Sequence, residues 1–281
     1  MPESTKVFVV LDPTCMEQAA LETGVGVVKK LKECRGIEAQ LHVYCCINAE
    51  SVALVPEKDE AQIRAATIAR VSGWLERLVL SIRSEGIAVE TEVEWVDDWR
   101  KAIAVAASRQ SSTIVLKNMT QHSRFVRLVR DTSDWTLIRE CECPVFLVKT
   151  GKPFQIDSVL VAVKHSPDEK IYEQANKSIL ESARRMADDL GAEMHVVTCY
   201  EGDRLPDRQR FADQCGLERR QVSAASGKPE SIIAEVAAEQ GSDLVIIARV
   251  ARPESPGEVG KTARKVIDEI DADVLVLPVA S

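Results

Sequence analysis

An internal repeat constrains the fold of this chain more than any other feature. AQLHVYCC at residues 39–46 matches AEMHVVTC at 192–199 with four of eight positions identical, and KVFVVLDPT at 6–14 corresponds to SVLVAVKHS at 158–166. The matched segments occur in the same order in both halves. Because self-similarity at a fixed period indicates a repeated structural unit, we expect two tandem domains built on the same plan.

The spacing between matched segments changes part-way along the chain. The first two pairs are separated by 152 or 153 residues, whereas SSTIVLKN at 111–118 and GSDLVIIA at 241–248 are separated by 130. The second half has therefore lost most of one element. In the first half, residues 57–86 predict an amphipathic helix, whose apolar side chains either pack in the core or line a cavity for an acyl-type ligand.

Within each half, short apolar segments rich in β-branched residues alternate with helix-like segments. This alternation predicts parallel sheets covered by helices on both faces. The expected fold class is α/β, with two tandem doubly wound five-stranded parallel-sheet domains, flavodoxin-like or similar, packed as a pseudo-dimer. The domains are expected at 1–150 and 156–281, because Gly151 and Pro153 interrupt any regular element between them.

Composition excludes several classes of function. The net charge is −8 and the sequence pI is about 5.3, which disfavours nucleic acid and anionic membranes as partners because both attract basic surfaces. No apolar run approaches the roughly 18 residues of a membrane helix. The chain also starts without the apolar stretch of a signal peptide, so a cytoplasmic location is expected.

Cysteines and histidines give no sign of a metal centre. The eight cysteines are too sparse for a disulfide scaffold, and we expect Cys34, Cys45, Cys46 and Cys199 to be reduced and buried. Cys141-Glu142-Cys143 directly precedes an apolar strand and is interpreted as a turn, with metal or redox chemistry as the alternative. No catalytic nucleophile–base pair stands out, so no catalytic residue and no metal ligand are predicted.

The segment Gly257-Glu258-Val259-Gly260-Lys261-Thr262 has some likeness to a phosphate-binding P-loop. The spacing is wrong, because the glycine required five residues before Gly260 is Ser255, and Pro256 removes a backbone N–H from the loop. The segment is expected to be a loop that leads into a helix. It lies where doubly wound sheets bind ligands, past the carboxyl ends of the strands.

The repeat and the strand ends resemble the universal stress protein family, and specifically its tandem, E-type members. The resemblance covers nearly the whole chain and depends on VFVVLDPT, EWVDDWRKAI, DTSDWTLIRECECPVFLVK and the final GKTARKVIDEIDADVLVLPV. It implies a universal-stress-protein fold, which is similar to that of the adenine nucleotide alpha hydrolases. Nucleotide-binding members of the family carry an aspartate after the first strand and a glycine-rich loop after the fourth.

Carried over to this chain, the family's binding loop is incomplete in both halves. In the second half Ala248 and Ala251 replace the first two glycines, Gly260 matches the last one, and Lys164 replaces the aspartate. The candidate ligand-binding residues are Lys164, Ala248, Arg249, Ala251, Gly260, Lys261 and Thr262. Lys164, Arg249, Arg252 and Lys261 would suit an anion, although they could equally be solvated surface charges.

The first half keeps the aspartate but has lost the loop. Asp12 is in place and is the remaining candidate, either as a ligand contact or as a local turn cap. No glycine lies between Asn118 and Asp134, and Asp131 aligns with Gly260, where a carboxylate would repel phosphate. An intact nucleotide loop is therefore expected in neither half.

The resemblance implies a non-enzymatic stress-response protein that binds a small, anionic or nucleotide-like ligand or a protein partner. ATP stays open as a ligand, with a degenerate motif. The alternatives are a weak ATPase that uses the Gly260 loop and a ligand-free interaction scaffold. Homodimerisation of the tandem chain is left open.

Overall fold

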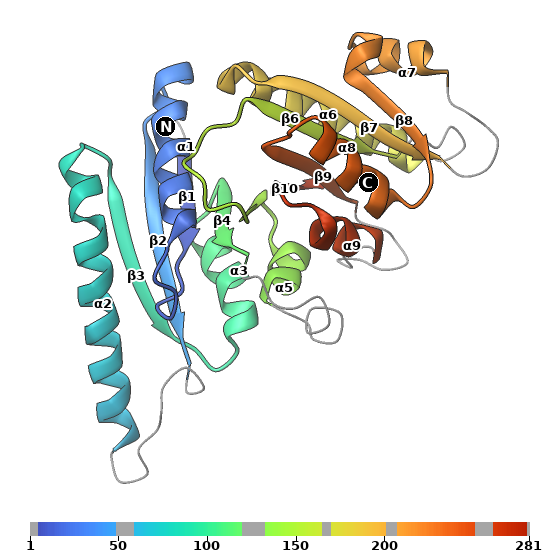
Figure 1. Cartoon of the computed structure of the whole chain (residues 1–281). Helices are drawn as coiled ribbons and strands as arrows, with labels where there is room; N and C mark the ends of the chain where they lie inside the picture. The colour runs from blue at the N-terminus through green and yellow to red at the C-terminus, as the bar shows by residue number, and fades with distance from the viewer. Residues whose placement is uncertain are drawn as a thin grey trace. The chain divides into compact units, whose positions relative to one another are not determined.

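The computed structural model describes residues 5–48, 59–119, 133–164, 170–200, 207–250 and 261–279 (Figure 1). These residues divide into two compact units with a boundary between Phe154 and Gln155. The boundary follows Gly151, whose φ of 60° is in the left-handed region that glycine tolerates best. Each unit is an α/β sheet structure, and the packing of the two domains as a pseudo-dimer stays a prediction.

The first unit alternates strands and helices in the order expected from the sequence. Its elements are β1 (Thr5–Val10), α1 (Ala19–Arg35), β2 (Ala39–Ile47), α2 (Glu60–Ser84), β3 (Val89–Trp95), α3 (Trp99–Arg109), β4 (Ile114–Asn118), α5 (Ser133–Glu140) and β5 (Val145–Val148).

The second unit repeats this order with one much shorter helix. Its elements are β6 (Ser158–Val163), α6 (Lys170–Leu190), β7 (Glu193–Tyr200), α7 (Arg208–Cys215), the 3-10 turn η2 (Arg219–Gln221), β8 (Val222–Ser226), α8 (Pro229–Glu239), β9 (Leu244–Val250), α9 (Lys261–Glu269) and β10 (Asp273–Val279). The 8-residue α7 stands where the first unit has the 25-residue α2, so the predicted loss of most of one element is confirmed.

The strand registers of the two units coincide residue for residue. Phe8 pairs with His42 and Val115 in the first unit, and Leu160 pairs with His195 and Val245 in the second. These partners are separated by the same offsets of 152, 153 and 130 residues that the sequence repeat shows. The two sheets are therefore built on one template, and corresponding positions can be compared directly.

Each sheet is parallel and doubly wound. The strand order is β3-β2-β1-β4-β5 in the first unit and β8-β7-β6-β9-β10 in the second, which differs from the flavodoxin order 2-1-3-4-5. In the first unit α1 packs on the face that carries Val7, Val9 and Leu41, whereas Arg109 at the end of α3 reaches Glu92 on the opposite face. The order changes direction between β1 and β4, and between β6 and β9, where such sheets bind ligands.

Helix α2 runs beside the edge strand β3 (Figure 1). Its buried residues recur every three or four positions, at Thr67, Val71, Leu75, Val79 and Ile82, as expected for one helix face on a sheet. Leu80 on the other side of the helix is exposed. Ordinary core packing thus accounts for the apolar face of α2.

Helix α1 approaches the core closely because it carries two glycines. A Cβ atom added at Gly24 would lie 2.7 Å from Cγ2 of Val9, and one at Gly26 would lie 2.4 Å from the Phe154 ring. Real Cβ contacts are not that short, so these positions exclude any side chain unless the neighbours move. The glycines therefore set the distance at which α1 packs.

All eight cysteines lie within the described residues, and none of them is in a disulfide. Cys45 is buried, and Cys46 and Cys199 are half-buried. Burial raises the pKa of Cys45 to about 12, and that of Cys46 and of Cys199 to about 11. The prediction that Cys34 is buried was wrong, because this residue lies on the exposed side of the last turn of α1.

Candidate functional site

Four of the predicted site residues, Asp12, Lys164, Ala248 and Arg249, lie at the carboxyl edges of the two sheets, where the strand order changes direction. Asp12 follows β1 in the first unit, and Lys164 occupies the corresponding position after β6 in the second. Ala248 and Arg249 belong to the end of β9, which neighbours β6. The carboxyl ends of adjacent parallel strands thus bring candidates from distant parts of the sequence to one edge within each unit.

The side chain of Asp12 stabilises a local turn. Its carboxylate accepts hydrogen bonds from the backbone N–H of Thr14 at 2.8 Å and from the Thr14 hydroxyl at 2.6 Å. The side chain of Gln18 donates to the backbone carbonyls of Asp12 at 2.7 Å and Cys15 at 2.8 Å. This is the Asx-turn role of aspartate, and it favours turn capping over ligand contact for Asp12.

Asn118 at the end of β4 also serves the fold. Its side-chain oxygen accepts the backbone N–H of Ala20 at 2.6 Å, in the first turn of α1. Gln18, at the N-cap of α1, makes no side-chain capping bond of its own. An asparagine from a neighbouring strand therefore satisfies one of the N–H groups that every helix start leaves open.

A buried ion pair lies at the same carboxyl edge of the first unit. The Lys117 ammonium lies 2.6 Å from Oδ1 of Asp134, with side chains only 12% and 5% exposed. The Lys117 ammonium also donates to the backbone carbonyl of Asn118 at 3.3 Å. Asp134 lies in the first turn of α5, where the helix dipole favours a negative charge. The chain thus places its own carboxylate at the helix start where an anionic ligand would bind.

The second unit has apolar residues at the two corresponding positions. The repeat aligns Lys117 with Ile247 and Asp134 with Ala263, and Ile247 is 5% exposed. The first turn of α9 contains no acidic residue. The start of α9 is therefore not neutralised by a carboxylate of its own first turn.

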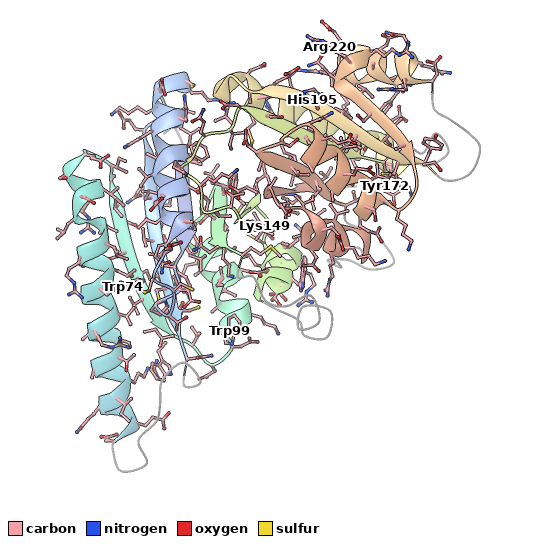
Figure 2. All side chains as sticks on the ribbon, in the orientation of Figure 1. Trp74, Trp99, Lys149, Tyr172, His195 and Arg220 are labelled. Atoms are coloured by element: carbon pink, nitrogen blue, oxygen red, sulfur yellow. The ribbon has the colours of Figure 1, made fainter. Side chains whose placement is uncertain are left out.

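Cationic side chains lie at the carboxyl ends of β6 and β9 in the second unit. The Lys164 ammonium is 3.9 Å from the ring centroid of Tyr172, a buried residue of α6 that is labelled in Figure 2. A cation over the face of an aromatic ring is attracted by the ring quadrupole. The backbone carbonyl of Lys164 accepts a 2.7 Å hydrogen bond from the Asn176 side chain. Arg249 is half-buried near the end of β9.

Lys261 and Thr262 are the first residues of α9, as expected for a loop that leads into a helix. The structure describes their backbone only. Ala251, Arg252 and Gly260, and likewise Asp131 in the first unit, lie outside the described residues. Their proposed roles stay predictions.

A second ion pair lies nearby in the second unit. Lys265 of α9 approaches Glu230 of α8 with an Nζ–Oε1 distance of 3.1 Å. A hydrogen bond from its own backbone N–H, together with Lys265, lowers the pKa of the Glu230 carboxyl. Glu230 therefore occupies the start of α8, in the way that Asp134 occupies the start of α5.

A polar network covers one face of the first sheet beneath α3. The buried His42 lies 2.8 Å from Glu92, which also pairs with Arg109, and the Tyr44 hydroxyl donates to Glu94 at 2.8 Å. Burial and then the bond to Glu94 raise the pKa of Tyr44. Each polar group in this network has a hydrogen-bond or ion-pair partner within it, so the network stabilises the fold.

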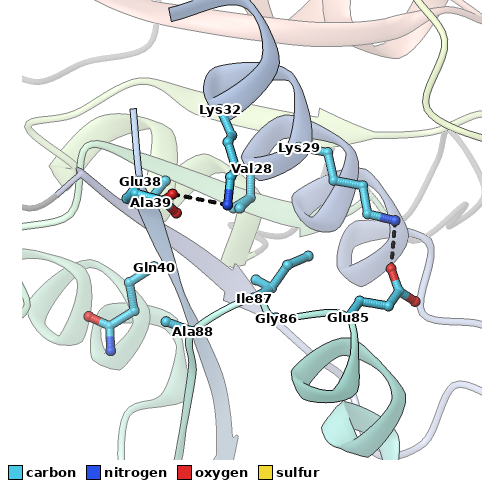
Figure 3. Close-up of a pocket in the computed structure, with 10 residues that line it drawn as sticks. All are labelled: Val28, Lys29, Lys32, Glu38, Ala39, Gln40, Glu85, Gly86, Ile87 and Ala88. Atoms are coloured by element: carbon cyan, nitrogen blue, oxygen red, sulfur yellow. Dashed lines mark ion pairs between the residues drawn. The ribbon is translucent and has the colours of Figure 1, made fainter. Parts of the chain in front are cut away.

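A shallow cavity of about 450 Å³ lies at the opposite, amino edge of the first unit (Figure 3). Its floor includes Val28, Ala39 and Ile87, and two ion pairs flank it, Lys29–Glu85 at 2.7 Å and Lys32–Glu38 at 2.9 Å. The cavity contains none of the predicted site residues. Its cations are already paired, so it offers no free charge for an anion.

The part of the chain that the structure describes shows neither a metal-binding cluster nor a membrane-spanning helix. There, no cluster of three or more histidine, cysteine, aspartate or glutamate side chains could hold a metal ion. Likewise, none of the described helices combines the length and the apolar character needed to cross a bilayer.

Sequence reasoning missed the Lys117–Asp134 pair. A signal was present, because Lys117 interrupts the otherwise apolar segment IVLK of a strand that is expected to be covered on both faces. A buried lysine requires a partner, and a nearby carboxylate at a helix start is the natural one.

Curated proteins that are similar to this chain over nearly its whole length share one name. Universal stress protein E of Photorhabdus laumondii is 25% identical over 307 residues, which cover 99% of this chain and 96% of that protein. Universal stress protein E of Escherichia coli K12 is 24% identical, with 96% and 93% covered. No family model matches the chain.

Solved structures share the fold along the whole chain. A universal stress protein from Archaeoglobus fulgidus matches with a TM-score of 0.73 at 18% identity and covers 98% of this chain and 96% of its own. A protein of unknown function from Pseudomonas aeruginosa PAO1 matches with a TM-score of 0.75 at 21% identity, with 99% and 93% covered. The resemblance predicted from the sequence is thereby confirmed: over nearly its whole length the chain is similar to the tandem, E-type universal stress proteins.

Proposed function

We propose that this protein acts in a stress response by binding a small anionic ligand of the phosphate class in its second unit. The first unit does not bind such a ligand. In this proposal the first unit has a structural role, as the domain of the tandem chain that does not bind the ligand. The stress-response role follows the names of the relatives, and the division of labour follows from the differences between the two carboxyl edges.

The contrast at one pair of positions carries this proposal. In the first unit Asp134 provides a carboxylate at the start of α5 and pairs with Lys117 at 2.6 Å. In the second unit Ile247 and Ala263 leave the start of α9 without such a carboxylate. Helix starts attract anions through open N–H groups and the helix dipole, so the second edge is the favourable one.

Charge at the strand ends supports the same assignment. The position after the first strand is Asp12 in the first unit and Lys164 in the second. A lysine and the neighbouring Arg249 favour a phosphate or carboxylate group by charge-assisted hydrogen bonds. The strand registers of the two sheets are the same. The difference in charge between their carboxyl edges therefore comes from these side chains and not from the backbone.

Native mass spectrometry of the freshly purified chain, compared with the denatured chain, tests for a retained ligand. Thermal denaturation with ATP or pyrophosphate tests binding directly, because a ligand at 100 times its Kd stabilises the native state by about 2.7 kcal/mol. We expect Lys164→Ala and Lys261→Ala to abolish the shift. Arg220→Ala is the matched control, because it removes an exposed cation of the same unit that pairs with Glu218.

Failure would take either of two forms. No retained mass and no shift with either probe would favour the ligand-free scaffold. A shift that survives Lys164→Ala and Lys261→Ala together would place the ligand elsewhere. For the alternative of a weak ATPase, we expect no phosphate release above the buffer blank, and turnover that Lys261→Ala abolishes in folded protein would contradict the binding-only proposal.

A further inference from the structure

Two thiols meet in the turn that joins α5 to β5. Sγ of Cys141 and Sγ of Cys143 are 3.4 Å apart. Cys141 is 3% exposed, whereas Cys143 is half-buried and can be reached from solvent. From this geometry we propose that Cys141 and Cys143 form a dithiol site that chelates a single thiophilic atom, the trivalent arsenic of an arsenical.

The turn is held at both ends. The backbone N–H of Cys141 continues the hydrogen bonding of α5 by donating to the carbonyl of Leu137 at 2.9 Å. The carbonyl of Pro144 accepts the backbone N–H of Val115, in β4, at 2.9 Å. The two thiols are therefore preorganised, and a ligand that accepts their present separation gains affinity from this.

The separation suits a bridge of one atom. A disulfide has an S–S distance of about 2.05 Å, so the sulfurs would have to close by about 1.4 Å in a pinned turn. Metal–sulfur bonds of about 2.3 Å span about 3.8 Å at a tetrahedral angle and about 3.3 Å at a right angle. Trivalent arsenic bonds its ligands in a pyramid with angles close to a right angle, so the observed 3.4 Å matches it with little movement.

The protonation state of the Cys143 thiol also limits which ligands can bind at this turn. The hydrogen bond with Cys141, followed by burial, raises the pKa of the Cys143 thiol. Metal cations bind thiolates and release protons, and peroxides react with thiolates, so a protonated Cys143 thiol disfavours both. Among the described residues no third side chain completes a metal-binding cluster at this turn.

An arsenical reacts with neutral thiols, and the reaction balances without a redox step. In phenylarsine oxide, the As=O bond and the two S–H bonds break while two As–S bonds form. Both protons leave with the oxygen as one water molecule. Arsenic stays trivalent and neither sulfur is oxidised.

The test uses the full-length, reduced protein with phenylarsine oxide as the probe. We expect a mass gain of one phenylarsine bridge, the loss of two titratable thiols, and a bridged peptide that contains Cys141 and Cys143. Cys141→Ser and Cys143→Ser should each lower bridging at least 10-fold. Cys34→Ser is the matched control, because it removes an exposed cysteine elsewhere in the same unit and should leave bridging unchanged.

Several results would overturn the proposal. A bridge that maps to other cysteines, or that persists in Cys143→Ser, would do so. So would a pair that closes to a disulfide with oxidised glutathione while refusing the arsenical. Tryptophan fluorescence confirms that each variant is folded, and a variant that unfolds is replaced by Cys143→Ala. The site lies in the first unit, so its test is independent of the anion site proposed in the second.

Discussion

Replacing Asp134 with alanine should destabilise the first unit substantially. The side chains of Lys117 and Asp134 are 12% and 5% exposed, so Asp134→Ala would leave a largely buried ammonium without its carboxylate. Breaking a buried ion pair in this way costs 3–5 kcal/mol. Lys117 keeps its bond to the Asn118 carbonyl and some access to water, so we expect the lower end, about 3 kcal/mol.

The sequence of the second unit indicates which additional substitution should restore the stability lost in Asp134→Ala. The second unit carries Ile247 and Ala263 at the corresponding positions, so Lys117→Ile combined with Asp134→Ala copies a solution that the same fold already uses. Apolar replacement of both members of a buried pair is often neutral or stabilising. We therefore expect the free energy of unfolding of the double variant to lie within about 1 kcal/mol of that of the parent, although Asp134→Ala alone lowers it by about 3 kcal/mol.

Urea unfolding followed by tryptophan fluorescence measures this unit by itself. All four tryptophans, Trp74, Trp95, Trp99 and Trp135, lie before the boundary at Phe154, so the second unit contributes no signal. Fitting the transition of each variant gives the free energy of unfolding of the first unit. A double variant as unstable as Asp134→Ala, or a single variant within 0.5 kcal/mol of the parent, would refute the reasoning.

Three further predictions concern α1 and α2. Gly26→Ala should destabilise the first unit by about 1–2 kcal/mol, because overpacking against Phe154 outweighs the roughly 1 kcal/mol of helix propensity that alanine gains. Gly73→Ala, whose nearest neighbour is the end of a flexible Arg77 side chain at 3.6 Å, should instead stabilise by about 0.5–1 kcal/mol; the same urea titration measures both, and equal signs would contradict the packing explanation. Hydrogen bonds from Arg83 and Thr91 lower the pKa of Glu76 to about 2. Because this pKa is depressed in the folded state, the stabilisation by Glu76 persists above its ordinary value of 4.5 and is lost as the pH falls towards 2, so the difference between parent and Glu76→Gln should shrink over that range.

The fold was largely predictable from the sequence because its strongest signals are local and repeated. The segment KVFVVLD at 6–12 has a strand-like pattern and WRKAIAVAASR at 99–109 has a helix-like one, and they correspond to β1 (Thr5–Val10) and α3 (Trp99–Arg109). Apolar runs between helix-like segments determine a parallel sheet with few alternatives. The repeat then supplied the second unit, including its missing element.

The site was less predictable because its interactions join residues far apart in the sequence. Asn118 caps α1 from 98 positions away, which no local capping pattern reveals. Asp12 was placed correctly at a strand end, but only the hydrogen bonds of Thr14 and Gln18 show that it serves a turn. The exposed position of Cys34 depends on which side of α1 meets the sheet, which the helix-like sequence around this residue does not show.

The two units show how one duplicated backbone can hold opposite electrostatic arrangements at the same edge. The strand registers are the same, so the helix starts after β4 and β9 face comparable positions. In the first unit the chain neutralises this start with Asp134 and neutralises Asp134 with Lys117. In the second unit neither charge is present, and the nearby strand end carries Lys164 instead of an aspartate. In the first unit the carboxylate of Asp134 already interacts with both the start of α5 and the Lys117 ammonium. An external anion would therefore gain little by binding there. The first turn of α9 contains no carboxylate of its own, and for this reason we propose ligand binding in the second unit.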